Sequence, residues 1–228
     1  MSIKPEEYLQ AQSFAPSSPG PATPLNSAEQ AFVKKYVGTD TVRALEAQRQ
    51  DPPQALQLPV KAPDATDGGV GAPGEPPLLE RLKQAPAVQM VAFYLDAQVY
   101  LVPTMAVIEV LRYTPPVLLP MAPDYVAGVI NLRGKVTPLL YLENLLTTPR
   151  KTRETNRFII ICSHNGLQAG LIFDKVHTMY TFNQNQILWD VEARIGANTE
   201  YICGMVDVNE SILGVLSVGM IIDKALKD

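Results

Sequence analysis

The chain has 228 residues, a formal net charge of −4 and a hydrophobic share of 46%. This length allows one good-sized domain with an extension, or two small domains. The mildly acidic balance argues against nucleic-acid binding, which would require a basic patch. No apolar run reaches the ~20 residues that span a bilayer, so direct membrane insertion is not expected.

Residues 1–86 are rich in proline. They contain 13 of the 20 prolines, and tracts such as "SFAPSSPGPATP" and "KAPDATDGGVGAPGEPP" have few large apolar side chains. Such segments cannot bury enough surface to offset the entropy of ordering. We therefore expect residues 1–86 to form a largely disordered N-terminal tail.

One part of this tail has helical features. Ser27 and Gln30 are spaced as in a capping box, and Gly38 is a plausible helix stop, which together predict short helices at about 28–49. Four apolar residues cluster there at helical spacing: Phe32, Val33, Tyr36 and Val37. Two interpretations remain open: a transient helix pair, or a short motif that folds when it docks on a partner.

The pattern changes to short strands over residues 87–228. "VQMVAFYLDAQVYLVP" predicts two strands around a turn at Asp96 and Ala97, and "RFIIICSHNGLQAGLIFD" predicts a hairpin with Asn165 and Gly166 in a type I′ turn. "SILGVLSV" predicts a late strand, and "VGMIIDKALK" predicts a short C-terminal helix. Closely spaced strands indicate an all-β barrel or sandwich, with room for two small barrels that share a core.

A further hairpin is predicted in "GVINLRGKVTPLLYL". Gly134 takes positive φ easily, so the turn is expected there, between Leu132 and Val136. Lys135 is then expected in water at the tip. Since proline cannot donate to a ladder, the strand with Pro138 is expected at a sheet edge, or with that face free.

Residues that could carry chemistry are few. His164 and His177 do not have metal-site spacing, and no phosphate-binding or hydrolase motif is present. Cys162 and Cys203 are too few for a disulfide framework and are expected to be small buried side chains in a reducing compartment. We therefore expect no catalytic residues, no metal site and no cofactor. A small β-barrel enzyme or ligand-binding domain is the less favoured alternative.

Several sequence blocks resemble one known family. "YVAGVINLRGKVTPLLYL" is similar to the signature region of CheW, the coupling protein of bacterial chemotaxis. "VIEVLRY" with Glu109, "AGLIFDKV" with Gly170, "NTEYICGM" with Gly204 and the final "ILGVLSVGMII" resemble further blocks in the same order. The resemblance covers residues 87–228, and none of the tail.

The resemblance implies a fold and a function. The fold is all-β, with two SH3-like five-stranded β-barrels packed on each other and a short C-terminal helix, after the disordered tail. The function is that of a non-enzymatic adaptor, which couples methyl-accepting chemoreceptors to the histidine kinase CheA in signalling arrays. Its partners would be the cytoplasmic tip of a chemoreceptor and the regulatory domain of the kinase. Its location would be cytoplasmic, at membrane-associated receptor arrays.

The resemblance also implies which positions bind the receptor or the kinase, or support the fold that does so. These positions are Val107, Glu109, Gly128, Arg133, Gly134, Phe158, Gly170 and Gly204. From the residues alone, Arg133 is either a solvated hairpin arginine or a half-buried arginine that pairs with a carboxylate. Glu109 is the candidate for that carboxylate.

Two positions depart from the family pattern. Tyr141 stands where an acidic residue is common, and Ser217 stands where Asp or Asn is common. These departures leave open which receptor or kinase is preferred. A further alternative is a CheW-like scaffold whose tail recruits another partner, such as a localisation factor.

Overall fold

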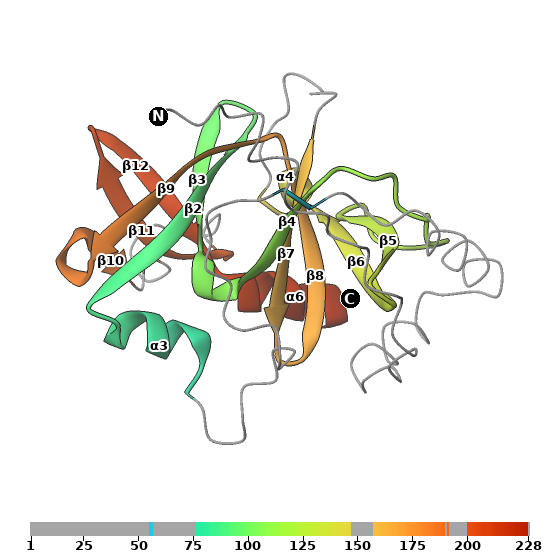
Figure 1. Ribbon diagram of the computed structural model, residues 1–228, viewed down its shortest axis with the longest axis horizontal. Coiled ribbons are helices and arrows are strands. Elements are labelled where there is room, and N and C mark those ends of the chain that lie inside the picture. Colours follow the sequence, from blue (N-terminus) through green and yellow to red (C-terminus); the bar gives the residue numbers. More distant parts are fainter. Residues whose placement is uncertain (1–54, 57–75, 147–156, 190, 192–199, 228) are drawn as a thin grey trace, which may run out of the picture.

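The computed structural model describes residues 55–56, 76–146, 157–189, 191 and 200–227. The predicted tail helices at 28–49, with Phe32, Val33, Tyr36 and Val37, lie outside the described residues. Most of the described chain is β-structure, in two sheets that occupy the two halves of Figure 1.

The first sheet has the strand order β1-β4-β7-β8-β6-β5. Its strands are β1 (Ala55–Leu56), β4 (Val107–Arg112), β5 (Val126–Leu132), β6 (Lys135–Tyr141), β7 (Phe158–His164) and β8 (Leu167–Phe173), and a short helix, α4 (Leu142–Leu145), follows β6. All neighbours are antiparallel except β6 and β8.

The second sheet has the strand order β10-β11-β12-β3-β2-β9. Its strands are β2 (Ala87–Leu95), β3 (Gln98–Pro103), β9 (Lys175–Asn183), β10 (Ile187–Trp189), β11 (Ile202–Val208) and β12 (Ser211–Leu216). Short 3-10 turns, η2 (Thr104–Ala106) and η3 (Gln184–Gln186), lead into β4 and β10. Two barrels of five strands each were predicted, and each of the two observed sheets has six strands. In the first sheet the additional strand is the short β1.

The predicted hairpins are confirmed. β2 and β3 flank a turn at Asp96 and Ala97, and β7 and β8 flank Asn165 and Gly166. Asn165 and Gly166 have φ angles of 49° and 78°, and positive φ at both central residues is the property of a type I′ turn. The late strand and the C-terminal helix, α6 (Val218–Lys227), are also present.

The three largest clusters of buried side chains are one core inside each sheet and one core between the sheets. Each inner core collects residues from all the long strands of its own sheet. In β7, Ile159 and Ile161 enter the inner core of the first sheet, whereas Ile160 and Cys162 enter the shared core. Because successive side chains of a strand point to opposite faces, this strand is apolar on both sides. The two barrels therefore share a core, as the sequence predicted.

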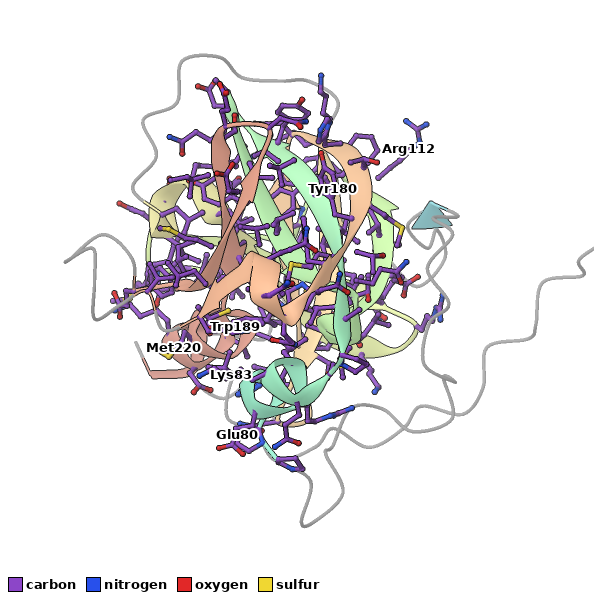
Figure 2. The ribbon with its side chains drawn as sticks, turned by 90° about the vertical axis from the view of Figure 1, so that its left-hand side faces the viewer. Glu80, Lys83, Arg112, Tyr180, Trp189 and Met220 are labelled. Atoms are coloured by element: carbon purple, nitrogen blue, oxygen red, sulfur yellow. The ribbon has the colours of Figure 1, made fainter. Side chains whose placement is uncertain are left out.

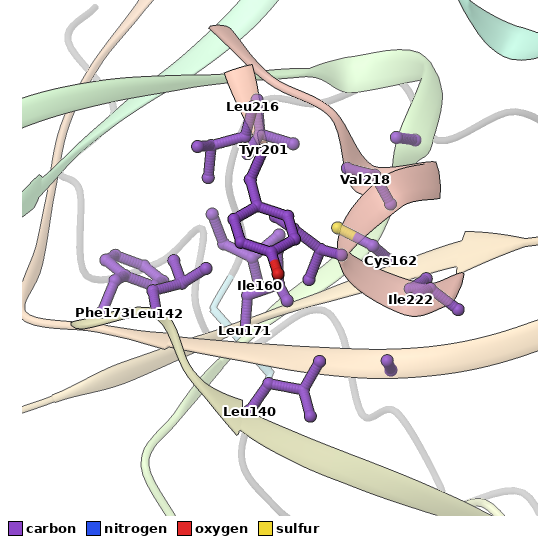
Figure 3. Close-up of a cluster of buried hydrophobic side chains, with 14 of the residues drawn as sticks. Leu140, Leu142, Ile160, Cys162, Leu171, Phe173, Tyr201, Leu216, Val218 and Ile222 are labelled. Carbon is purple, nitrogen blue, oxygen red and sulfur yellow. The ribbon is translucent and has the colours of Figure 1, made fainter. Parts of the chain in front are cut away.

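Helix α6 lies across the middle of the molecule (Figure 1). Figure 3 shows Val218 and Ile222 of this helix close to Cys162, in the cluster that also holds Tyr201. All of these side chains are less than a tenth exposed. The helix thus closes one end of the shared core.

Ordered structure begins before residue 87. Helix α3 (Leu78–Gln84) buries Leu82 in the inner core of the second sheet, while Glu80 projects away from the sheets (Figure 2). Gln184 donates hydrogen bonds of 2.6 Å from Nε2 to the carbonyl oxygens of Leu82 and Ala85. The packed part of the chain therefore extends into the range that was predicted as tail.

Pro138 lies on an internal strand, because β6 has neighbours on both sides, so of the two predicted arrangements the sheet edge does not apply and the free backbone position does. Pro138 is opposite Val129 of β5, and Val129 exchanges its backbone hydrogen bonds with Val117 on its other side. The register between β6 and β8 begins only at Leu139. Proline is tolerated here because its missing N–H falls just before that ladder.

Neither cysteine forms a disulfide and both are buried, as predicted. Burial raises the pKa of the Cys162 thiol well above its usual range, so this side chain behaves as a small apolar group. Among the helices that the structure describes, none is long and apolar enough to cross a bilayer.

Candidate partner-binding site

The turn between β5 and β6 presents Arg133 at its tip. Leu132 pairs directly with Lys135, so the turn consists of Arg133 and Gly134, with φ angles of 53° and 85°. The side-chain Oδ1 of Asn131 accepts a hydrogen bond of 2.9 Å from the Gly134 N–H and braces this turn. The prediction that Lys135 occupies the tip is wrong, because the tight two-residue turn places Lys135, half-buried, on β6.

Glu109 faces this tip from β4. The register between β4 and β7 shifts between Val107 and Glu109, which leaves Ile108 as an extra residue. Such a bulge re-aims the neighbouring side chains. Ile108 is accordingly 37% exposed, next to a glutamate whose side chain is only 13% exposed.

Arg133 and Glu109 form an ion pair. The distance between Arg133 Nη2 and Glu109 Oε2 is 2.9 Å. Because β5 lies at one end of the sheet order and β4 lies near the other, this contact shows that the first sheet curls back on itself. Glu109 is therefore the carboxylate partner of Arg133. The arginine side chain is 70% exposed rather than half-buried, because only its tip reaches the carboxylate.

Burial in the folded protein disfavours the ionised form of Glu109. Burial raises the pKa of Glu109 above its ordinary value of 4.5, and the Arg133 guanidinium partly offsets this rise. Arg133 also has a positive φ of 53°, which is unfavourable for most residues with a Cβ atom, and such strain is common at functional positions. The arrangement thus holds a cation in water, anchored from below by a carboxylate.

The other residues implied by the resemblance have packing roles. Val107 is 2% exposed in the shared core. Phe158 packs against that core and stacks on Phe173, with ring centroids 5.8 Å apart. These two side chains support β4 and β7, and they do not join the exposed pair.

Three of the implied glycines lie where close packing leaves little room for a Cβ atom. A Cβ atom at Gly128, where φ is 136°, would collide with the carbonyl oxygen of Val117. A Cβ atom at Gly170 would meet Ile159 at 2.7 Å, and one at Gly204 would meet Trp189 at 3.0 Å. Gly204 belongs to the second sheet. The structure therefore brings together Glu109, Arg133 and Gly134, while the remaining predicted residues support the fold.

A second ion-pair network was not predicted. Nη2 of Arg157 lies 2.8 and 2.9 Å from the two carboxylate oxygens of Glu143, and its Nε lies 3.5 Å from Oδ1 of Asp174. The other oxygen of Asp174 accepts a 2.6 Å hydrogen bond from the backbone N–H of Asp96, in the turn between β2 and β3. This network connects the two sheets. Its members are far apart in the sequence, and no local pattern indicates the contact.

The structure shows what surrounds Tyr141 and Ser217, the two positions that depart from the family pattern. The guanidinium carbon of Arg157 lies 5.6 Å from the ring centroid of Tyr141. Burial, followed by the neighbouring Tyr141, raises the pKa of the Tyr113 hydroxyl. Ser217 stands just before α6, and its carbonyl oxygen accepts a hydrogen bond from Ile221. Tyr141 therefore belongs to the buried network, and Ser217 belongs to the start of a helix.

Comparison with known proteins gives consistent matches. The model of the family described as "CheW-like domain" matches residues 89–226. The chemotaxis protein CheW of Bacillus subtilis is 25% identical over 60% of this chain and 87% of its own length. CheW of Helicobacter pylori is 26% identical over 64% of this chain and 94% of its own length.

Two further matches extend the comparison. The protein PilI of Pseudomonas aeruginosa is 33% identical over 40% of this chain and 52% of its own length. The crystal structure of the scaffolding protein TtCheW from Thermoanaerobacter tengcongensis is similar, with a TM-score of 0.54 and 25% identity over 58% of this chain and 90% of that protein. These matches confirm the resemblance that the sequence blocks predicted.

Proposed function

Because the chain belongs to the CheW-like family of chemotaxis scaffold proteins, we propose that it couples chemoreceptors to a CheA-type histidine kinase. In this proposal it binds the cytoplasmic tip of a chemoreceptor and the regulatory domain of the kinase. It acts without catalysis or cofactors, and binding recruits it from the cytoplasm to membrane-associated receptor arrays.

The observation that carries this proposal is the presentation of Arg133. A strained, mostly exposed arginine is held at a hairpin tip by a largely buried glutamate. An exposed ion pair of this kind adds only ~0–1 kcal/mol to stability. Fold stability therefore gives little reason for the arrangement, whereas a fixed, directed cation suits recognition of a carboxylate on a partner.

The test measures binding of the full chain to the kinase regulatory domain and to a receptor tip from the same organism. Arg133→Asn removes the cation and places at the turn a residue that tolerates positive φ. We expect this variant to remain folded, with an unfolding free energy at most about 1 kcal/mol below that of wild type, and to bind at least one partner about tenfold or more weakly, as is typical when a central charged contact is lost.

Lys83→Gln is the matched control, because it also removes one positive charge but lies on α3, outside residues 89–226. It should bind like wild type. Equal affinity of Arg133→Asn and wild type for both partners would refute the role of Arg133. Failure of the wild-type chain to bind either partner would refute the proposed function.

The tail-recruitment alternative makes a separate prediction. A chain without residues 1–54 should keep both array partners if the tail only localises the protein, and it should lose its cellular position. Residues 55 onward are retained because Ala55 and Leu56 belong to the first sheet.

A further inference from the structure

The face of the second sheet that forms the shared core continues outward as an exposed apolar surface. Leu188, Met205, Gly214 and Tyr100 are direct neighbours across β10, β11, β12 and β3, so they lie on one face of the sheet. Met205 and Tyr100 pack against the shared core from its margin. Leu188 is 43% exposed, and Ile212, two residues before Gly214 on the same face, is 69% exposed. We call Leu188, Met205, Ile212 and Tyr100 the outer patch.

The outer patch has an acidic rim. Asp207 pairs directly with Ile212, and Glu210 lies in the turn that joins β11 to β12. Both acidic residues are exposed. This end of the second sheet lies away from the first sheet (Figure 1). Contiguous apolar side chains with a polar rim are typical of an interaction site, and the rim favours an apolar occupant that carries positive charges.

The N-terminal tail contains a segment with this chemistry. Phe32, Val33, Tyr36 and Val37 are spaced as one face of a helix, and Lys34 and Lys35 stand between them. At about 100° per residue, the four apolar positions span an arc of about 140°, and one lysine lies about 60° beyond each end of that arc. A helix over this segment would therefore place an apolar stripe on the outer patch with a cation on either side.

The connection to the folded part is long enough. Residues 38–54 join this segment to Ala55, which pairs with Leu111 in the first sheet. These residues can span about 55 Å when extended, whereas a compact domain of this size is only about 40 Å across. Tethering also raises the effective concentration to the millimolar range, so a weak contact is sufficient.

We propose that the outer patch is a docking site for the chain's own tail segment, residues 28–37, which binds in cis as an amphipathic helix. Phe32 and Tyr36 lie against Ile212 and Leu188, and the two lysines face the acidic rim, as in other cases of a helix on an apolar surface. This inference does not depend on the proposed function, because both surfaces belong to this chain.

The first arm of the test uses the single tryptophan of the full chain as a fluorescence donor. Trp189 is next to Leu188 and packs on the opposite face of the sheet. A dansyl acceptor is attached at Ala31→Cys, since both native cysteines are buried. Ile212→Ser should weaken docking about tenfold and lower the docked fraction from about 90% to about 50%, with a matching fall in energy transfer. Leu118→Ser is the control, because it also removes an exposed leucine, 75% exposed, but outside the patch.

The second arm reverses the charges on both sides. Lys34→Glu/Lys35→Glu should lower the energy transfer, and adding Asp207→Lys/Glu210→Lys should restore it. Unchanged transfer in Ile212→Ser, or no recovery after the double reversal, would overturn the proposal. Transfer that rises with protein concentration would assign the outer patch to the tail of a second copy and would overturn docking in cis.

Discussion

Arg133, in the turn between β5 and β6, and Arg157, just before β7, both contact carboxylates, but the first arginine is exposed and the second is buried. The side chain of Arg133 is 70% exposed above Glu109, whereas that of Arg157 is 10% exposed between Glu143 and Asp174. The chemistry of the two contacts is the same, but the surroundings decide what each can do. The buried arginine connects the two sheets, and the exposed one holds a fixed charge at the surface, where the proposed function places a partner.

The largest expected effect comes from breaking the buried network. Arg157→Ala leaves two carboxylates without their cation in a site with little water, which should cost about 3–5 kcal/mol of unfolding free energy. Chemical denaturation measures the loss. Arg157→Lys keeps the charge without the planar fork and should recover part of it. A loss as small as that of Arg133→Asn would contradict the difference between the two sites.

The next prediction compares the stability loss at Gly128, which is closely packed, with the loss at Gly134, which lies in a turn. Gly128→Ala places a Cβ atom against the carbonyl oxygen of Val117 at a φ of 136°, so it should cost about 1–3 kcal/mol. Gly134→Asn meets open space at a φ of 85° and should cost less than about 1 kcal/mol. Thermal unfolding of both variants measures the difference, and equal losses would show that Gly128 does not support the sheet edge.

A smaller effect concerns the pH dependence of the exposed pair. The raised pKa of Glu109 means that the folded state favours its protonated form, so its contribution to stability is fully present below the unfolded pKa of about 4.5 and is lost as pH rises through the folded value. Arg133 lowers this pKa, so Arg133→Asn should enlarge the loss, by up to about 1 kcal/mol between pH 4 and pH 7. Denaturation at both pH values measures it. Parallel pH profiles for variant and wild type would show that the two side chains are not coupled.

The smallest effect is expected from Glu109→Gln. This change removes a carboxylate that is costly to ionise and leaves Arg133 in water, so the unfolding free energy at pH 7 should change by less than about 0.5 kcal/mol. Binding to the partner of Arg133 should still weaken, because the guanidinium loses its anchor. Calorimetric titration beside a denaturation curve distinguishes these outcomes, and a loss of several kcal/mol would place Glu109 among the supports of the fold.

The features that the sequence predicted correctly are those determined by residues close to one another in the sequence. Asn165-Gly166 requires positive φ at two consecutive positions, and the apolar runs on either side fix the strands, so that hairpin was located to the residue. Arg133 was harder to place. The two-residue turn, the bulge at Ile108 and the reach to Glu109 depend on strands that meet only in the folded sheet.

Other features depend only on residues that are far apart in the sequence. Arg157 meets Glu143 and Asp174 because three elements converge, and the short pairing of Ala55 and Leu56 depends on an available edge. Neither is visible as a period or a motif. Residues 55–56 were expected to belong to the disordered tail, and their pairing with β4 depends on the folded sheet.

The path of the chain through the two sheets has a consequence for biosynthesis. β2 and β3 belong to the second sheet, yet their neighbours β9 and β12 follow only after every long strand of the first sheet. The strands of the first sheet can therefore pair with one another before the second sheet is complete, while their face toward the shared core is still partly uncovered. The hairpin of β2 and β3 must wait, because its pairing closes long loops and is entropically slow. A chain that is cut short before β9 would therefore leave this apolar hairpin open to aggregation, while the sheet that carries Arg133 is already formed.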